Sequence, residues 1–337
     1  MKPFKLGKHI LKHGLFLAPM AGVTDAAFRS ICKMFGAEFM ISEMVSAKAM
    51  HYHDPKTREL AHIPQAQKPM GIQLFGSEPE ILAEAAKMLC EMPVAPDAID
   101  LNMGCPVRKI TANGEGSALM KNPKLAAQIV RAVRSAVPYG IPVTVKFRTG
   151  WDSAKKNAVE FGKYVEDAGA DAVCIHGRTK EQMYLPPVDY ETIADVKHAL
   201  QIPVIGNGGI IHAQSALDML QQTGCDALMI ARGAEGNPWI FEEIAAALDQ
   251  MPYEKPTLAE RLRVMVLHVN CLIAEKGEAT GTAEARKHLA WYLTGVRGGP
   301  AARGKLNHAT NFSQVKQILQ EVAEQNHLKK SEYGFLL

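Results

Sequence analysis

Short apolar runs recur along the first 232 residues, each six residues long and rich in Val, Ile, Leu, Phe and Met. Most of the intervals between them contain a helix-length amphipathic stretch, such as 78–91, 123–137 and 157–168. Near-continuous apolar runs that alternate with helices are typical of parallel strands buried on both faces. The eight runs are LFLAPM (15–20), FMISEM (39–44), MGIQLF (70–75), AIDLNM (98–103), PVTVKF (142–147), AVCIHG (172–177), PVIGNG (203–208) and DALMIA (226–231).

Eight strand and helix units predict an α/β fold of the (β/α)8 TIM barrel type, with an open doubly wound sheet as the alternative. We expect the barrel to occupy residues 1–248 and a linker with two prolines to follow at 249–256. Residues 257–337 contain no strand-like run and predict an all-helical C-terminal domain. Its expected helices include 264–274, 283–293 and 311–326, and 295–304 is expected to be a flexible basic loop.

The residues at the strand ends carry the first functional signal. Active sites of such barrels lie at the carboxyl ends of the strands. A single polar strand end is more often an unremarkable rim residue, but here nearly every strand ends in one, which favours a shared site. The side chains at these ends are Pro19 and Met20, Glu43, Gln73, Asn102 and Cys105, Lys146 and Arg148, His176 and Arg178, Asn207, and Arg232.

Two glycine-containing loops predict a phosphate site. Asn207-Gly208-Gly209 follows the seventh strand, and Ala231-Arg232-Gly233 follows the eighth. These loops and a short helix after them form the usual phosphate grip of the fold, in which glycines let backbone N–H groups approach the anion. Turn glycines without a ligand are the alternative reading. The chain has no G-x-x-x-x-G-K-[ST] loop, so nothing indicates a P-loop nucleotide triphosphatase.

Composition indicates a globular protein without a membrane-spanning segment. The chain is 47% hydrophobic and 22% charged, which is typical of a globular fold. No apolar stretch approaches the ~20 residues of a membrane span, and the run at 15–20 is too short for an export signal. Six scattered cysteines without a C-x-x-C pair favour a reduced, cytoplasmic protein without structural zinc. We expect no metal site; the HYHD sequence at 51–54 is interpreted as a solvated loop.

Charge is uneven along the chain. The net charge of +3 is too small to indicate nucleic-acid binding, but residues 285–320 contain six basic residues and no acidic one. The six are Arg286, Lys287, Arg297, Arg303, Lys305 and Lys316.

Four segments together resemble the tRNA-dihydrouridine synthases, most closely their bacterial B-type branch. They are APMAGVTD (18–25), DLNMGCP (100–106), VKFRTGW (145–151) with IHGRT (175–179), and ALMIARGAEGNPWIF (227–241). APMAG also occurs in other flavin barrels, whereas DLNMGCP followed by GSALM (116–120) is specific to this family. The resemblance is strong over residues 10–245 and weaker over RKHLAWYLTG (286–295).

The resemblance implies FMN as the cofactor and NADPH as the reductant. Pro19, Met20 and Ala21 would line the isoalloxazine face, and Gln73 and Lys146 its polar edge. The phosphate would contact Asn207, Gly208, Gly209, Ala231 and Arg232, although the family often has Asp at the position of Gly209 and Gly at that of Ala231. A cation such as Lys146 in a low-dielectric mouth stabilises the negative charge of a reduced flavin.

The resemblance also implies roles around the uracil base. Hydride would reach C6 from the flavin, and Cys105 would donate a proton to C5; a thiol with a pKa near 8.5 is protonated at pH 7. Asn102 and Arg178 would bind the base, and His176 would serve the flavin or the base. Arg286 and Lys287 in the basic stretch would contact tRNA.

Two functions therefore remain open. One is reduction of uridines in tRNA by a monomeric enzyme without membrane contact. The other is an FMN barrel oxidoreductase that acts on a free pyrimidine or another small molecule. The basic helical tail favours the first function, because a free pyrimidine does not need one.

Overall fold

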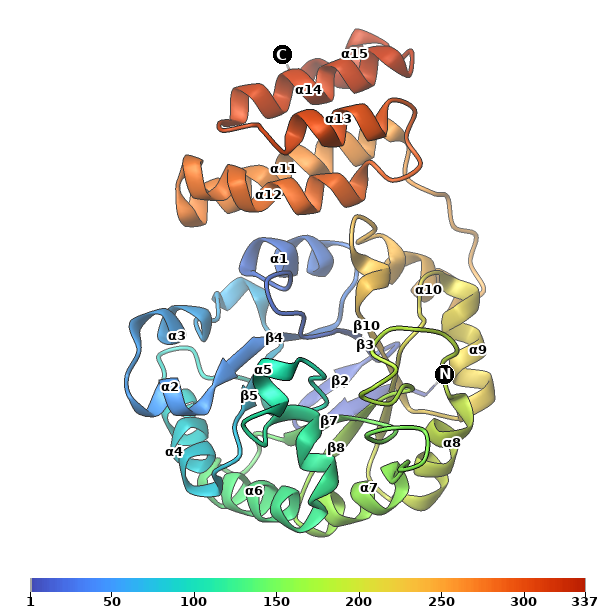
Figure 1. Cartoon of the computed structure of the whole chain (residues 1–337). Coiled ribbons are helices and arrows are strands. Elements are labelled where there is room, and N and C mark those ends of the chain that lie inside the picture. Colours follow the sequence, from blue (N-terminus) through green and yellow to red (C-terminus); the bar gives the residue numbers. More distant parts are fainter. Residues whose placement is uncertain (1, 337) are drawn as a thin grey trace.

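Eight parallel strands close into a barrel in the computed structural model, which describes residues 2–336 (Figure 1). The order around the barrel is β10-β3-β4-β5-β6-β7-β8-β9, so each strand pairs with its neighbours in sequence and the last pairs with the first. The predicted (β/α)8 barrel is confirmed. The strands are β3 (Leu15–Leu17), β4 (Phe39–Ser46), β5 (Met70–Phe75), β6 (Ala98–Met103), β7 (Val143–Arg148), β8 (Ala172–His176), β9 (Val204–Asn207) and β10 (Ala227–Ile230).

Amphipathic helices surround the barrel and bury their apolar faces against the strands. Local signals fix several of their starts: the Asp25 carboxylate accepts the N–H of Phe28 at the start of α1, and Asn122 caps α6 with Pro123 in the first turn. The principal helices are α1 (Ala26–Met34), α2 (Ala47–His51), α3 (Pro55–Leu60), α4 (Pro79–Cys90), α5 (Arg108–Thr111), α6 (Pro123–Ala136), α7 (Ala158–Asp167), α8 (Tyr190–Ala199), α9 (Ala213–Thr223) and α10 (Ile240–Leu248). Short 3₁₀ segments lie at η1 (Gln65–Gln67), η2 (Gly116–Lys121) and η3 (Arg232–Ala234).

A hairpin of β1 (Phe4–Leu6) and β2 (His9–Leu11) closes the amino-terminal end of the barrel. Phe4 contacts Phe16 edge to face with ring centroids 5.5 Å apart, and Phe16 contacts Phe39 at 5.3 Å. The hairpin was not among the predicted elements. Because it fills one end, the open end of the barrel is the carboxyl end of the strands.

A helical region follows after Leu248. It consists of α11 (Leu258–Lys276), α12 (Glu278–Tyr292), α13 (Gly299–Leu306), α14 (Phe312–Gln325), α15 (Lys330–Tyr333) and η4 (Gly334–Leu336). Thr257 and Glu260 form a capping box at the start of α11. The prediction of a loop at 295–304 is wrong from Gly299 onward, because Ala302 and Leu306, one turn apart, are buried in the helical core and hold α13 in place.

The helical region packs on one flank of the barrel, where α11 and α12 lie beside α1 (Figure 1). Trp239 of the barrel contacts Phe35 at 5.0 Å and Tyr292 of α12 at 6.1 Å between ring centroids. Gly236, with φ +68°, lies against the backbone of Trp291, where a β-carbon would collide. The barrel and the helical region therefore share an apolar core at this junction.

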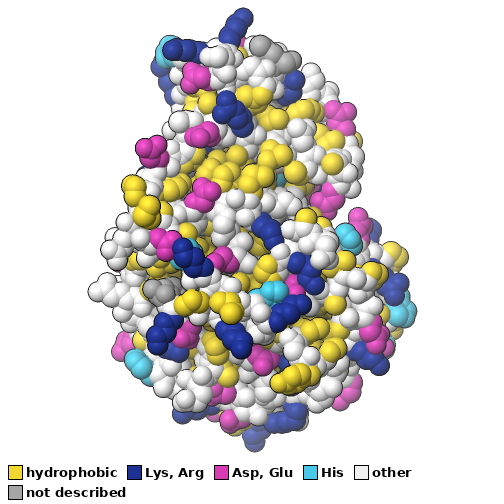
Figure 2. All heavy atoms as spheres, turned by 180° about the vertical axis from the view of Figure 1, so that it is seen from behind, with side chains coloured by type: hydrophobic (Ala, Val, Ile, Leu, Met, Phe, Trp, Pro, Cys, Tyr) yellow, Lys and Arg dark blue, Asp and Glu magenta, His cyan; other side chains and the backbone are white. Residues whose placement is uncertain are grey.

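The opposite face of the molecule shows basic and acidic side chains interspersed over the barrel (Figure 2). Within residues 2–336, no helix combines the length and apolar character that a membrane crossing requires.

Candidate active site

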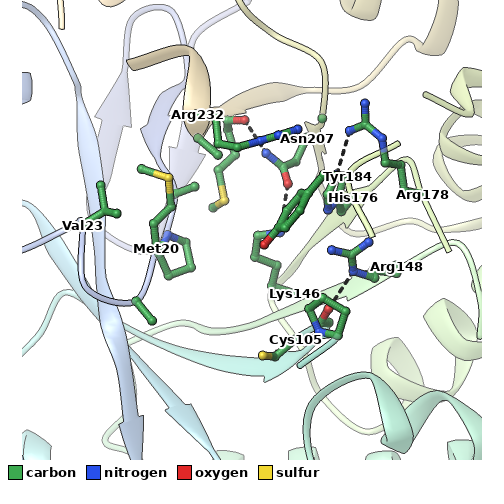
Figure 3. A pocket seen from close by; sticks show the side chains of 18 of the residues that line it. Met20, Val23, Cys105, Lys146, Arg148, His176, Arg178, Tyr184, Asn207 and Arg232 are labelled. Carbon is green, nitrogen blue, oxygen red and sulfur yellow. Dashed lines mark hydrogen bonds between the residues drawn. The ribbon is translucent and has the colours of Figure 1, made fainter. Parts of the chain in front are cut away.

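A cavity of about 580 Å³ lies at the carboxyl ends of the strands (Figure 3). Its volume lies within the range of small-molecule and cofactor sites. All the side chains that the sequence predicts for the cofactor, the proton donor and the base line this one cavity. They are Pro19, Met20, Ala21, Gln73, Asn102, Cys105, Lys146, His176, Arg178, Asn207, Gly208, Gly209, Ala231 and Arg232.

A chain of hydrogen bonds runs from the barrel interior to the Cys105 loop. The Thr144 hydroxyl and the Gln73 amide both donate to the buried carboxylate of Asp100, at 2.5 and 2.6 Å. Asn102 Nδ2 then donates to Gln73 Oε1 at 2.8 Å, and Asn102 Oδ1 accepts the backbone N–H of Cys105 at 2.9 Å. Since a carboxylate only accepts, Asp100 fixes the orientation of each amide that follows it.

Asp100 keeps this role at neutral pH. Burial raises the pKa of its carboxyl to about 6, although the hydrogen bonds from Thr144 and Gln73 and the charge of Lys146 lower it. The group is therefore mainly a carboxylate at pH 7.

Ser117 also holds the loop that carries Cys105. The N–H and hydroxyl of Ser117 both donate to the carbonyl of Cys105, at 3.0 and 2.9 Å. Gly116, with φ +59°, lies so close that a β-carbon there would come within 2.9 Å of the same carbonyl oxygen. Burial raises the pKa of the Cys105 thiol above its ordinary value, so the thiol carries its proton at neutral pH.

Lys146 lies at the end of β7 on the floor of the cavity. Its ammonium donates to Asn207 Oδ1 at 2.9 Å, and Asn207 Nδ2 donates to the carbonyl of Met229 at 2.7 Å. Burial lowers the pKa of Lys146 below 10.5. The arrangement places one cation between β7 and the strands β9 and β10.

Arg148 joins the Cys105 loop to the loop after β8. It is buried, and its guanidinium donates to the carbonyls of Gly104, Thr179 and Met183 at 2.8–2.9 Å. Burial lowers the pKa of Arg148 to about 10, which still leaves it charged. The sequence placed Arg148 at a strand end but assigned it no role; in the structure it holds two loops together.

His176 and Arg178 form a pair on the next wall. Arg178 Nη1 lies 3.1 Å from His176 Nε2, and burial lowers the pKa of His176 well below 6.5. A guanidinium can only donate, so Nε2 of this neutral ring must accept and its proton is on Nδ1. His176 therefore has an N–H donor at Nδ1 and a fixed tautomer.

Tyr184 also lines the cavity, from the loop after β8, although it is not among the residues predicted from the sequence. Its ring lies under the Arg232 guanidinium, 4.5 Å from the ring centroid. A tyrosine in an irregular loop follows no strand periodicity, so no pattern in the sequence marks it.

The loop after β9 has glycines in the left-handed region, as the phosphate prediction requires. Gly208 and Gly209 have φ values of +114° and +71°, and a β-carbon at Gly208 would come within 2.8 Å of the His176 ring. Arg232 is exposed beside them. Glu235 also lines the cavity, and burial raises the pKa of its carboxyl.

Arg286 and Lys287 lie on α12, outside the residues that line the cavity. Arg286 is half-buried and donates twice to the carbonyl of Ala309, at 3.0 and 2.6 Å. Its guanidinium therefore holds the segment before α14. The Lys287 side chain makes no hydrogen bond within residues 2–336.

The family profile and the two relatives compared with this chain are all dihydrouridine synthases. A profile of the family described as Dihydrouridine synthase (Dus) matches residues 16–329. The chain is 40% identical to tRNA-dihydrouridine synthase B of Pseudomonas putida over 311 residues, which cover 91% of this chain and 90% of the relative. It is 39% identical to the probable tRNA-dihydrouridine synthase of Rickettsia conorii, over 97% of this chain and 99% of the relative.

Among solved structures, histamine dehydrogenase from Rhizobium sp. 4-9 has a similar fold, with a TM-score of 0.57 at 15% identity. The similarity covers 80% of this chain and 50% of that one.

Proposed function

Because the chain belongs to the dihydrouridine synthase family, as its motifs predicted, we propose that it is a flavin-dependent oxidoreductase that reduces specific uridines in tRNA to 5,6-dihydrouridine. The observation that carries this proposal is the hydrogen-bond chain from Asp100 to Cys105. It fixes the loop of a protonated thiol at the edge of a cofactor-sized cavity, which a binding protein would not need.

The residues of the cavity fit FMN. The left-handed glycines after β9 and the exposed Arg232 after β10 would hold the phosphate, and Lys146 on the cavity floor would stabilise negative charge on the ring. Pro19, Met20 and Ala21 provide an apolar wall for a flat ring. When bound, the flavin supplies the hydride for C6 of the base, and NADPH is the proposed source of that hydride.

Cys105 is the proposed proton donor to C5. Burial keeps the thiol protonated, and the hydrogen bonds from Ser117 and to Asn102 fix its loop. Asn102 uses both ends of its amide in this network, so we propose that it positions Cys105 as well as facing the base. His176 Nδ1–H and Arg178 are the donors available to the carbonyl oxygens of uracil.

The helical region favours tRNA over a free pyrimidine. It packs beside the loops that contain residues 18–25 and 232–239, both of which border the cavity. A base must leave its stack to reach such a site, at a cost of a few kcal/mol, so contacts to the rest of the RNA are needed. The basic stretch at 285–320 is the proposed source of those contacts.

Mapping of dihydrouridine in total tRNA tests this function. Cells that lack the gene are expected to lose dihydrouridine at defined positions, and a plasmid copy of the gene is expected to restore it. An unchanged map in the deletion strain would rule out a tRNA substrate.

A further inference from the structure

Three titratable side chains that the proposed reaction does not use meet between the barrel and the helical region. Asp25 precedes α1, His268 lies on α11 and His288 lies on α12, which are adjacent in Figure 1. One potential metal-ligand atom from each lies within 4.8 Å of the other two. None of the three lines the active-site cavity, so the cluster is separate from it.

The cluster is almost completely buried. His268 and His288 are 1% exposed and Asp25 is 6% exposed. Asp25 Oδ2 lies 3.5 Å from His288 Nε2, and the two imidazole centroids are 4.3 Å apart. Phe28 packs against both imidazoles at 5.9 and 5.4 Å, so apolar surface encloses the polar atoms.

Most of the polar atoms of the cluster have no hydrogen-bond partner within residues 2–336. These atoms are Asp25 Oδ2, His268 Nε2 and both ring nitrogens of His288. Each such group costs about 1–3 kcal/mol when it is buried without a partner, and native proteins rarely leave one, let alone four together. The cluster therefore has the composition of a site that binds something.

The remaining atoms of the cluster are already engaged. Asp25 Oδ1 accepts the N–H of Phe28 at 2.8 Å, and His268 Nδ1 lies 3.4 Å from the Tyr292 hydroxyl. This leaves Oδ2 and Nε2 as the free ligand atoms of the two residues. A histidine that binds metal usually has such a second partner on its other ring nitrogen, which fixes the orientation of the ring.

We propose that Asp25, His268 and His288 bind one divalent transition-metal ion, Zn²⁺ in particular. Two imidazoles and a carboxylate are ligands that suit zinc, whereas Mg²⁺ and Ca²⁺ prefer oxygen ligands alone. In a tetrahedral zinc site neighbouring ligand atoms are about 3.3 Å apart, close to the 3.5 Å between Asp25 and His288.

A metal here would join the two parts of the chain. Asp25 ends the loop that contributes Pro19, Met20 and Ala21 to the active-site wall, and the two histidines come from α11 and α12. The proposal concerns the docking of the helical region and does not depend on the reaction proposed above.

Metal content of the tag-free, cofactor-loaded protein tests the site. Mass spectrometry is expected to find about one Zn²⁺ per chain, and X-ray absorption at the zinc edge a shell of nitrogen and oxygen without sulfur. Removal of metal by a chelator is expected to lower Tm, and added Zn²⁺ to restore it. Substoichiometric metal in protein whose Tm does not respond to Zn²⁺, or a sulfur ligand, would overturn the proposal.

Two variants locate the ion. Asp25→Asn keeps a good cap for α1 but weakens the ligand, and His268→Phe replaces one ring by another of similar shape; both are expected to lose the metal and the Tm response. The control, His51→Gln with His53→Gln, removes the histidines of the HYHD segment and is expected to retain both. Zinc that persists in the first two variants, or that disappears in the control, would place the ion elsewhere.

Discussion

Cys105 is held in place through its backbone. Its backbone N–H and carbonyl are both engaged, with Asn102 and Ser117, and burial raises its pKa. A group fixed in this way can deliver a proton without searching for its target, which is the requirement for a general acid.

Cys105→Ala is therefore expected to slow uridine reduction by about 10²–10⁴-fold, the usual contribution of a positioned acid, while flavin content and NADPH oxidation stay unchanged. Single-turnover reduction of tRNA measures the step. Cys90→Ala, at a half-buried cysteine of α4, is the matched control and is expected to react at the wild-type rate. Wild-type turnover by Cys105→Ala would remove Cys105 from the reaction.

The residues of the site divide into those that sequence could predict and those that it could not. Lys146, His176 and Asn207 were predictable because parallel strands bring their carboxyl ends to one mouth. Asp100 begins the DLNMGCP motif, but its role was not predictable, because its hydrogen-bond partners come from two other strands. Tyr184 lies in a loop, where no periodic pattern in the sequence marks it.

Three adjacent strands share the hydrogen-bond chain that starts at Asp100. Gln73 is on β5, Asp100 and Asn102 are on β6, and Thr144 is on β7. Because the Asp100 carboxylate can only accept, the Gln73 amide must point its N–H₂ toward Asp100 and its oxygen toward Asn102. The orientation of the Cys105 loop therefore depends on a residue in the barrel interior.

Asp100→Asn is expected to disturb the orientation of the Gln73 and Asn102 amides, because an amide can present N–H₂ where Gln73 needs an acceptor. We expect a loss of about 1–3 kcal/mol in stability and a slower tRNA half-reaction, measured by urea unfolding and single-turnover assays. Thr144→Val is the control, since it removes one donor without reversing any amide, and its effect on the rate should be smaller. Equal rates in the two variants would show that amide orientation is unimportant.

The helical elements show where sequence reasoning stopped. Glycines at 295–304 suggested a loop, yet burial of Ala302 and Leu306 makes α13 a helix, because tertiary packing overrides weak local propensity. The hairpin of β1 and β2 was missed since three-residue strands are too short for a periodic signal.

The basic stretch can now be tested at side chains that hold no backbone carbonyl. Arg286 holds the Ala309 carbonyl, so its replacement would disturb the fold; Lys287 and the exposed Arg297 are better choices. Reversal of both to Glu is expected to weaken tRNA binding and to flatten its salt dependence by roughly 0.7–0.9 per lost phosphate contact. Titration of labelled tRNA at several salt concentrations measures this.

Lys163→Glu is the control for charge. This exposed lysine lies on α7, on the side of the barrel away from the helical region (Figure 1). It is expected to bind tRNA like the wild type. Undiminished binding by the Lys287 and Arg297 double variant would move the RNA surface away from this stretch.

In the whole molecule, the barrel contains the candidate active site and the helical region lies beside the loops that border it. The alternation of strands and helices made the barrel predictable from sequence. The junction was not, because Asp25, His268 and His288 are far apart in the chain and meet only when α1, α11 and α12 pack together. A spacing pattern cannot reveal ligands that separate elements contribute.

The decisive experiment is reduction of tRNA by the purified protein. The protein would be supplied with FMN and NADPH and given, in parallel, unmodified tRNA transcript and free uridine, with dihydrouridine quantified by mass spectrometry. We expect dihydrouridine at defined positions of the transcript and none from free uridine. Reduction of free uridine while the transcript stays unmodified would refute a tRNA substrate and support the small-molecule alternative.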